Sequence, residues 1–244
     1  MRTKPTADDD LYPTPEDAYA AYRRDPAEFF ARYQDRHTDE RTLISPDWRW
    51  YETKYHYNLL ENAIIDLLRG LGNPVIGNVV LDVGAGTGHW IEFYLKYLEA
   101  REVVAVDFSP TAVERLRSRY LDLPAVTVQR RDICEPEAEF EGRFDVVNAI
   151  GVMFHIVDDA RWRRAVANLC RYLRPGGVAI IGGDFGDRTE ELGVMRRVRS
   201  LALWEEVVAE AGGRVAEVKR FDWFKGGVNP GLKNNLLAFC RPAP

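Results

Sequence analysis

A glycine-rich turn follows a short apolar run about one-third of the way along the chain. In VLDVGAGTGHW, residues 80–90, three glycines alternate with other residues at Gly84, Gly86 and Gly88. Glycine adopts backbone conformations that other residues rarely take, and it lets a ligand approach the main chain closely. If the apolar run is a strand of a parallel sheet, its turn lies where ligands bind. The turn is therefore expected to hold a ligand.

The spacing of the turn narrows the choice of ligand. Dinucleotide, mononucleotide and S-adenosylmethionine sites all use glycine turns of this kind. His89 stands where a dinucleotide fingerprint requires its third glycine, which weakens the interpretation as a pyrophosphate site. No Gly-Lys-Ser/Thr follows the turn, as a mononucleotide phosphate loop would need.

Two further carboxylates follow the next apolar runs. Asp107 lies 23 residues past Gly84 and can accept hydrogen bonds from both ribose hydroxyls, which selects an adenosyl group without a 2′-phosphate. This role fits NAD and S-adenosylmethionine alike. Asp132, in RRDI, can accept a hydrogen bond from the exocyclic amine of adenine. Together they favour an adenosyl ligand.

Two candidate catalytic bases lie after the fourth and fifth apolar runs. His155, in GVMFHIVDD, has an imidazole whose pKa suits removal of a proton from a hydroxyl or ammonium group near neutral pH. Asp184, in IIGGDFGD, would need a raised pKa or would position a cation. The alternative for His155 is that it only packs or fastens its loop.

Three other stretches are candidates for binding an acceptor. Aromatic residues crowd positions 48–57, where Tyr51, Tyr55, His56 and Tyr57 would form a lid and contact the acceptor, or pack on the sheet. Trp223, in DWFKGGVNPGLK, would form the opposite wall. MRRVRS, residues 195–200, is interpreted as a solvated helix face, with contact to an anionic substrate as the alternative.

The elements that must position these residues form an alternating pattern. Pro15 and Pro26, each at a position that a first helical turn tolerates and each followed by an apolar stripe, predict two short helices. Apolar residues at helical spacing predict a core helix over 58–69. Beyond Asn78, seven short apolar runs alternate with helical stretches, and only residues 222–233 separate the last two runs. This predicts a doubly wound α/β fold: a mostly parallel seven-stranded sheet with an antiparallel C-terminal hairpin strand. Residues 1–75 are expected to form a helical lid, and 76–244 the binding domain.

Composition limits the classes of function. A formal charge of −5 and a pI of about 5.5 disfavour nucleic acid as a substrate. No apolar run reaches the roughly 20 residues that span a bilayer, and the first residues lack a signal peptide's apolar segment, so a soluble cytoplasmic protein is expected. Cysteines and histidines are scattered, so no metal site is expected. A homo-oligomer is left open.

Five motifs in register carry a family resemblance. VLDVGAGTG, VVAVDFSP, RRDI, FDVVNAIGVMFHI and LRPGGVAII resemble the successive motifs of class I S-adenosylmethionine-dependent methyltransferases of the small-molecule type. The match covers about residues 78–183. The resemblance implies S-adenosylmethionine as the cofactor. Its methionine portion would be surrounded by Asp82 and the main chain of Gly84, Ala85 and Gly86, and its ammonium end would face Ala149 and Ile150. Asp107 would hold the ribose, Phe108 would lie against adenine, Asp132 would accept from the adenine amine, and Ile133 would offer its amide.

The expected reaction is methyl transfer to a small-molecule hydroxyl, or amine, by in-line displacement. NAIGVMFHI lacks the Asn/Asp-Pro-Pro-aromatic motif of nucleobase amino-methyltransferases, so a sugar or secondary metabolite is the better expectation. Alternatives are an N-methyltransferase of a small amine and a nucleic-acid or protein methyltransferase. From other classes, an NAD-dependent oxidoreductase and a noncatalytic adenosyl-binding subunit also remain.

Overall fold

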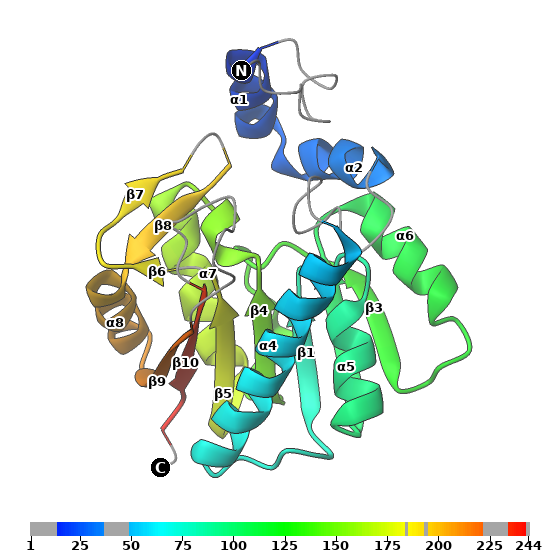
Figure 1. Ribbon diagram of the computed structural model, residues 1–244, viewed down its shortest axis with the longest axis vertical. Coiled ribbons are helices and arrows are strands. Elements are labelled where there is room, and N and C mark those ends of the chain that lie inside the picture. The colour runs from blue at the N-terminus through cyan, green and yellow to red at the C-terminus, as the bar shows by residue number, and fades with distance from the viewer. Residues whose placement is uncertain (1–13, 37–48, 184, 193–194, 222–233, 243–244) are drawn as a thin grey trace.

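A seven-stranded sheet forms the centre of the protein (Figure 1). The computed structural model describes residues 14–36, 49–183, 185–192, 195–221 and 234–242. The strands lie in the order β3 (Val126–Arg130), β2 (Glu102–Asp107), β1 (Val79–Val83), β4 (Phe144–Ile150), β5 (Leu173–Gly182), β10 (Asn234–Cys240) and β9 (Arg214–Phe221). Strands β1 to β5 pair in parallel, and β10 is antiparallel to both β5 and β9. This confirms the predicted sheet and its reversed C-terminal strand.

Helices cover both faces of the sheet, so its central strands are almost wholly buried and mostly apolar. Successive strand residues point to opposite faces. Leu81 enters the core beneath α7 (Asp159–Tyr172) and α8 (Leu201–Glu210), while its neighbour Val80 enters the core beneath α4 (Trp50–Gly70) and α5 (His89–Tyr97). Both side chains are fully buried. Burial on two faces explains why the strands appear in the sequence as continuous apolar runs.

Several helices begin directly after the short connections that follow the strands at the carboxyl edge of the sheet. Asp107 ends β2, and α6 (Pro110–Arg119) begins three residues later, with the Ser109 hydroxyl accepting the Ala112 amide at 3.4 Å. Two short 3₁₀ turns also interrupt the connections, at Ala138–Phe140 and at Met153–His155. The candidate site residues at strand ends are thus held between a strand and the start of a helix.

A small second sheet was not predicted. Strands β6 (Phe185–Gly186), β8 (Arg197–Ser200) and β7 (Glu190–Glu191) form it, after β5. The prediction of a solvated helix face at residues 195–200 is therefore wrong. The physical reason is the alternation along β8: Val198 is buried on one side, while Arg197 and Arg199 both bond Asp159 from the other.

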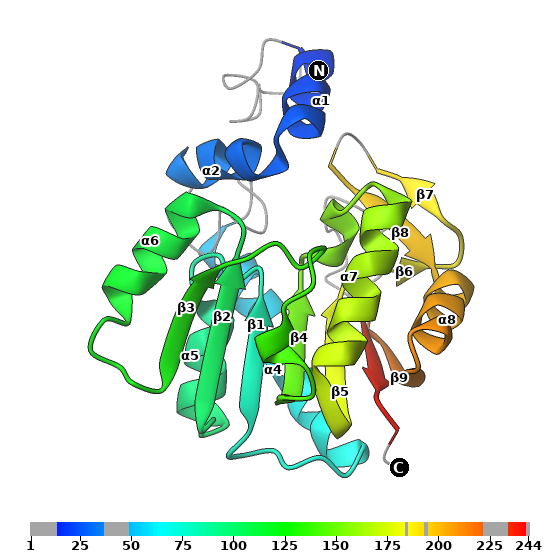
Figure 2. The same cartoon turned by 180° about the vertical axis from the view of Figure 1, so that it is seen from behind.

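The N-terminal helices lie beyond the carboxyl edge of the main sheet. Figures 1 and 2 show α1 (Pro15–Arg24) and α2 (Pro26–Arg36) past the end toward which the parallel strands run. Helix α4 begins at Trp50, eight residues before the predicted start of the core helix, so the aromatic stretch is its first two turns. Within the described part of the chain, no helix is both long and apolar enough to cross a bilayer.

Candidate active site

The glycine turn between β1 and α5 has a backbone that requires glycine. The φ angles are +67° at Gly84, +55° at Gly86 and +89° at Gly88. The amides of Gly84 and the next residue, Ala85, both donate to the carbonyl of Val106, at 2.8 and 3.1 Å, which ties the turn to the end of β2. A Cβ atom on Gly84 would meet Cγ2 of Val152 at 2.5 Å. The left-handed backbone and the close approach therefore act together at Gly84.

Asp82 is a buried carboxylate with one unpaired oxygen. It is fully buried on β1, and Oδ1 accepts a hydrogen bond from Nδ2 of Asn148 on β4 at 2.8 Å. The amide oxygen of Asn148 accepts in turn from the hydroxyl of Tyr94 on α5, at 3.4 Å. Among the residues that the structure describes, Oδ2 of Asp82 has no hydrogen-bond partner. Burial raises the pKa of Asp82 to about 7, against the Asn148 hydrogen bond, which lowers it. A cationic group would satisfy this oxygen.

Asn148 and Tyr94 were missed in the sequence. A signal existed for Asn148, which is a polar residue between the apolar pairs Val146-Val147 and Ala149-Ile150 of β4. A fully buried amide needs hydrogen-bond partners, and the adjacent strand supplies Asp82. Nothing in the spacing of Tyr94 separates it from the other core residues of α5.

Asp107 links the glycine turn to the start of α6. Its Oδ2 accepts from the amide of Gly86 at 3.0 Å, and its Oδ1 accepts from the amide of Ser109 at 2.9 Å. Burial raises the pKa of this carboxyl, and the backbone hydrogen bonds act in the opposite direction. A carboxylate offers about four acceptor positions, so further donors can still be bound. Asp107 is thus both a structural fastener and a candidate ligand contact.

The carboxylate of Asp132 is held from two sides. Its Oδ2 lies 2.5 Å from Nη2 of Arg161 on α7, and its Oδ1 accepts from the amide of Cys134 at 2.9 Å. The carbonyl of the neighbouring Ile133 accepts from Nδ2 of Asn168, also on α7, at 2.8 Å. Helix α7 therefore fixes this end of the site. Asp132 is about one-third exposed, unlike the buried Asp82 and Asp107.

His155 lies just past the carboxyl end of β4. Its Nδ1 is 2.9 Å from the carbonyl of Met195, and its own carbonyl accepts from the hydroxyl of Tyr22. Burial lowers the pKa of His155 to about 4; the Met195 hydrogen bond opposes this, and the charge of Arg196 lowers it further. The imidazole is thus neutral at pH 7. Because a carbonyl only accepts, Nδ1 carries the hydrogen, and Nε2 keeps its lone pair.

The helices α1 and α2 bring aromatic rings to this edge. The ring of Phe30 lies 5.5 Å from that of Phe108 at the end of β2 and 5.1 Å from that of His155 beyond β4. Tyr22 packs against Phe30 at 6.1 Å and reaches the His155 carbonyl with its hydroxyl. These two residues were missed in the sequence. They connect the N-terminal helices to both halves of the carboxyl edge.

The predicted acceptor residues of α4 are divided between surface and core. Tyr51 and Tyr55 are exposed, whereas Tyr57 is buried and stacks on His89 with ring centroids 3.5 Å apart. Burial, together with the neighbouring His89, lowers the pKa of His56 to about 4. Tyr57 thus packs against the helix that follows the glycine turn. Asp184 and Trp223 lie outside the described residues.

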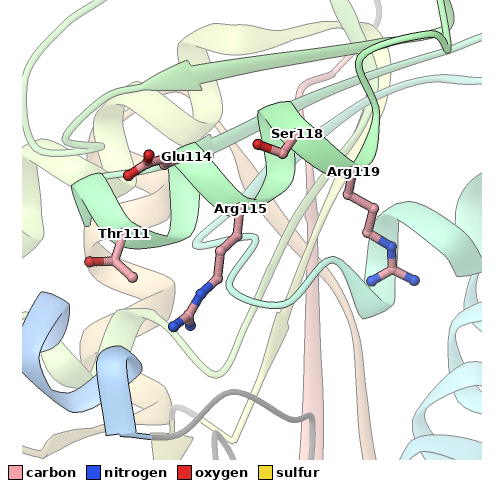
Figure 3. A pocket seen from close by; sticks show the side chains of 5 residues that line it. All are labelled: Thr111, Glu114, Arg115, Ser118 and Arg119. Atoms are coloured by element: carbon pink, nitrogen blue, oxygen red, sulfur yellow. The ribbon is translucent and has the colours of Figure 1, made fainter.

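Ala149 and Ile150 lie at the carboxyl end of β4, next to β5. Ala149 is fully buried and Ile150 partly so. A separate shallow groove of about 700 Å³ follows the exposed side of α6, lined by Thr111, Glu114, Arg115, Ser118 and Arg119 (Figure 3). No candidate site residue within the described ranges lines this groove, so we do not assign it to the site at the strand ends.

Comparisons with known proteins agree with this arrangement. Residues 80–177 match the family described as a methyltransferase domain. A probable S-adenosylmethionine-dependent methyltransferase of Mycobacterium tuberculosis is 37% identical over 105 residues, which is 42% of this chain and 34% of that protein. The cypemycin N-terminal methyltransferase of a Streptomyces species is 34% identical over 139 residues, 51% of this chain and 54% of that protein. The chain thus matches about a third to a half of these relatives' lengths.

A solved structure extends the similarity to nearly the whole fold. The 1,6-didemethyltoxoflavin-N1-methyltransferase of Burkholderia thailandensis, solved with 1,6-didemethyltoxoflavin and S-adenosylhomocysteine bound, has a TM-score of 0.62 and 24% identity. The similarity covers 99% of this chain and 93% of that one. At this identity the likeness concerns the fold. Residues 80–177, which include the glycine turn, thus match a methyltransferase domain, and the fold around them is similar to that of this S-adenosylhomocysteine-bound methyltransferase.

Proposed function

We propose that this protein transfers a methyl group from S-adenosylmethionine to a hydroxyl or an amine of a small-molecule acceptor. The observation that carries the proposal is the buried Oδ2 of Asp82, which has no partner beside a turn that only glycine can form. A buried carboxylate without a cation is costly unless a ligand supplies the charge. S-adenosylmethionine, when bound, supplies both a cationic amino-acid end and the electrophilic methyl group on its sulfonium.

The residues of this edge fit the parts of that cofactor. Asp82 would accept from the ammonium, and Asp107 has acceptor positions left for the ribose hydroxyls after binding Gly86 and Ser109. We assign the remaining contacts to the main chain of Gly84, Ala85, Gly86, Ala149 and Ile150 at the methionine end, and to Phe108, Asp132 and the Ile133 amide at the adenine end. Asp132 would then share its carboxylate between Arg161 and the adenine amine.

On the acceptor side, the proposed roles are alignment, exclusion of water and removal of a proton. Displacement at a sulfonium methyl requires donor and nucleophile to be in line, so positioning supplies much of the rate. His155 would take the proton of a hydroxyl or ammonium at Nε2, since its Nδ1 hydrogen is held by the Met195 carbonyl. Helices α1 and α2 would cover the site through Tyr22 and Phe30.

Further acceptor contacts are proposed from the sequence. Tyr51, Tyr55, His56, Tyr57 and Trp223 would line the acceptor side, and Asp184 would contact the acceptor or assist as a base. Two of the similar proteins act, by their names, on the N-terminus of cypemycin and on 1,6-didemethyltoxoflavin. These names are consistent with a small-molecule or short-peptide acceptor and with methylation at nitrogen. Another relative acts, by its name, on cytidine of tRNA, and another similar structure is described as an O-methyltransferase family protein, so the proposal keeps both a hydroxyl and an amine.

Calorimetry with S-adenosylhomocysteine and NAD tests the cofactor assignment. The parent protein should bind S-adenosylhomocysteine and not NAD, and Asp82→Asn should bind it at least tenfold more weakly because the charge partner of the ammonium is lost. Asp66→Asn is the matched control, since Asp66 is an exposed carboxylate on α4, 3.5 Å from Lys219. Asp107→Ala is less informative, because it also releases the amides of Gly86 and Ser109.

The outcomes separate the competing functions. Binding of NAD in place of S-adenosylhomocysteine would make the protein an oxidoreductase. Equal affinities for the parent and Asp82→Asn would refute the ammonium contact. Release of S-adenosylhomocysteine from S-adenosylmethionine, measured against a panel of small hydroxyl and amine acceptors, tests turnover. Tight cofactor binding with no turnover on any acceptor would instead support a noncatalytic adenosyl-binding subunit.

A further inference from the structure

Three arginines lie close together in the sequence, Arg196 just before β8 and Arg197 and Arg199 within it, and the two in the strand are paired. Arg197 bonds Glu191 at 2.8 Å and Asp159 at 2.9 Å. Arg199 is almost fully buried, bonds Asp159 at 2.9 Å, and its guanidinium lies 4.5 Å from the centre of the Trp162 ring. Both point to the start of α7. The charges of Arg197 and Arg199 are therefore paired with acidic side chains of the fold.

Arg196, the neighbour of these residues, has no such partner. Among the contacts of the described residues, its guanidinium makes no hydrogen bond or ion pair, although the side chain is partly buried. Burial alone lowers the pKa of Arg196, and no acidic group opposes that effect. Buried cations in proteins are normally paired, since removing a charge from water without compensation is costly. A partly buried guanidinium without a partner is typical of an anion-binding residue in the ligand-free state of a protein.

The position of Arg196 places it at the acceptor side of the site. The preceding residue, Met195, holds the His155 ring through its carbonyl at 2.9 Å. The charge of Arg196 also acts on the same ring, where it lowers the pKa of His155. Phe154 and Phe30 flank that imidazole, with ring centroids 4.4 and 5.1 Å away. A cation therefore lies near the candidate base, beside aromatic rings.

We propose that Arg196 binds an oxyanion group, a carboxylate or a phosphate, carried by the methyl acceptor. The inference rests on the proposed function and specifies its substrate class as acidic, with an aromatic or other apolar body suited to Phe30 and Phe154. A guanidinium is planar and presents paired N–H donors that match two oxygens of such a group. The bound oxyanion would fix the acceptor beside Nε2 of His155.

This arrangement would also couple acceptor binding to catalysis. In the ligand-free protein, the positive charge of Arg196 disfavours a protonated His155. An anion on Arg196 offsets that charge, so the affinity of His155 for a proton rises when the acceptor is in place. The base would thus be strengthened only in the complex that needs it. Arg197 and Arg199 cannot serve in this way, because Asp159 and Glu191 already pair with them.

Calorimetry on protein saturated with S-adenosylhomocysteine tests the inference. The probes are benzoate, phenyl phosphate and the uncharged benzamide. We expect at least one of the two anions to bind ten times more tightly than benzamide, and Arg196→Gln to abolish that preference. Arg196→Lys keeps the positive charge but not the paired N–H donors of the guanidinium, so this variant should retain part of the preference for the anions. Arg188→Gln is the matched control, because Arg188 is 83% exposed and paired with Glu190 at 3.3 Å.

A spectroscopic measurement provides an independent readout. The His155 ring proton, followed by NMR without S-adenosylhomocysteine, should titrate at a higher pH in Arg196→Gln than in the parent or in Arg188→Gln. The inference is wrong if neither anion binds more tightly than benzamide, or if Arg196→Gln and Arg188→Gln weaken binding equally. A parent protein that fails to bind S-adenosylhomocysteine at all would contradict the proposed function instead. The titration shift of His155 would then still report whether Arg196 lies beside it.

Discussion

The carboxyl edge of the sheet has two halves that are built in different ways. On the cofactor half, Asp82, Asn148 and Asp107 come from the adjacent strands β1, β4 and β2, and they bond one another or the glycine turn. On the acceptor half, His155 is held by Tyr22 from α1 and by Met195 from the segment before β8. One half is formed within the sheet, and the other by segments far apart in the chain.

This difference explains how one fold can keep its cofactor and change its acceptor. Parallel pairing brings the ends of β1, β2 and β4 together whatever surrounds them, so the proposed cofactor contacts follow from the sheet. The contacts of His155 depend on how α1 and the segment before β8 pack. A change in either segment can reshape the acceptor half without disturbing Asp82 or Asp107. The two halves should therefore respond separately to mutation.

The largest effect is expected for His155→Asn. The asparagine Nδ2 can still donate to the Met195 carbonyl, but the lone pair of Nε2 is lost. If His155 is the base, kcat should fall by about 10²–10⁴-fold. The affinity for S-adenosylhomocysteine, measured by calorimetry, should stay unchanged because the cofactor half is intact. A kcat equal to that of the parent would leave His155 with a packing role.

The pH profile gives a second test of the same residue. A base must be unprotonated, so kcat/KM should rise as the pH rises through the pKa of His155 in the free enzyme. That pKa is lowered to about 4, so the rise should occur well below the usual histidine range. Because the pKa of Asp82 is raised to about 7, the profile is measured with S-adenosylmethionine saturating and the acceptor varied, so that the Asp82 carboxylate is already paired. Under these conditions a rise near pH 6.5 would show that the imidazole is solvated in solution, which contradicts the packing of α1 and α2 over it.

On the cofactor half, Asp82→Asn should change the pH dependence of stability. The pKa of Asp82 is raised by burial from 3.8 to about 7, so its favourable contribution is complete below about pH 4 and lost as the pH rises through 7. The loss in the parent is up to about 4 kcal/mol. The free energy of unfolding of the variant, relative to the parent, should therefore increase between pH 4 and pH 8. Urea titrations at both pH values measure this difference, and a constant difference would contradict it.

The sheet and its helices were largely predictable from the sequence, because burial on two faces leaves an unmistakable pattern. The strand runs FDVVNAI and NNLLAFC are almost wholly apolar, and glycine or charged residues bound them. Short segments were less predictable. In RVRS of β8, four residues are too few to separate a period of 2 from a period of 3.6, so the strand was mistaken for a helix face.

The site was predictable to the extent that the sheet determines it. Asp82, Asp107 and Asp132 lie at or near strand ends, and the topology alone brings these ends to one edge. The contact of Tyr22 with His155 spans 133 positions and depends on how two short helices pack, for which no local pattern exists. Arg196 carries the same side chain as Arg197 and Arg199, and only its surroundings leave it without a partner among the described residues.

A smaller effect on the cofactor half is expected for Gly84→Ala. The left-handed backbone costs alanine about 1–2 kcal/mol. The contact of its Cβ with Val152 at 2.5 Å adds to that cost. Gly212→Ala is the matched control, since Gly212 has a φ of +79° and open space around its Cβ position. In urea titrations, Gly84→Ala should lower the free energy of unfolding more than Gly212→Ala does. Adding Val152→Ala to Gly84→Ala should remove this difference between the two glycine variants. Equal losses for Gly84→Ala and Gly212→Ala would contradict the steric part.

The smallest effect is expected for Tyr22→Phe, which tests whether the N-terminal helices depend on the acceptor half. The hydroxyl of Tyr22 donates to the His155 carbonyl, and burial raises the pKa of Tyr22 to about 12, so it stays a donor at neutral pH. Loss of one such hydrogen bond costs about 1 kcal/mol.

Hydrogen exchange of the α2 amides should therefore be about fivefold faster in Tyr22→Phe, the change that corresponds to that free energy. Tyr19→Phe is the control on the same helix, because the Tyr19 ring contacts Arg23 through its face and the substitution preserves that face. Equal exchange in the two variants would mean that packing, including that of Phe30 on Phe108 and His155, holds α1 and α2 without help from the Tyr22 hydroxyl. In that case the ring of Phe30, which contacts both halves of the edge, would couple the two halves.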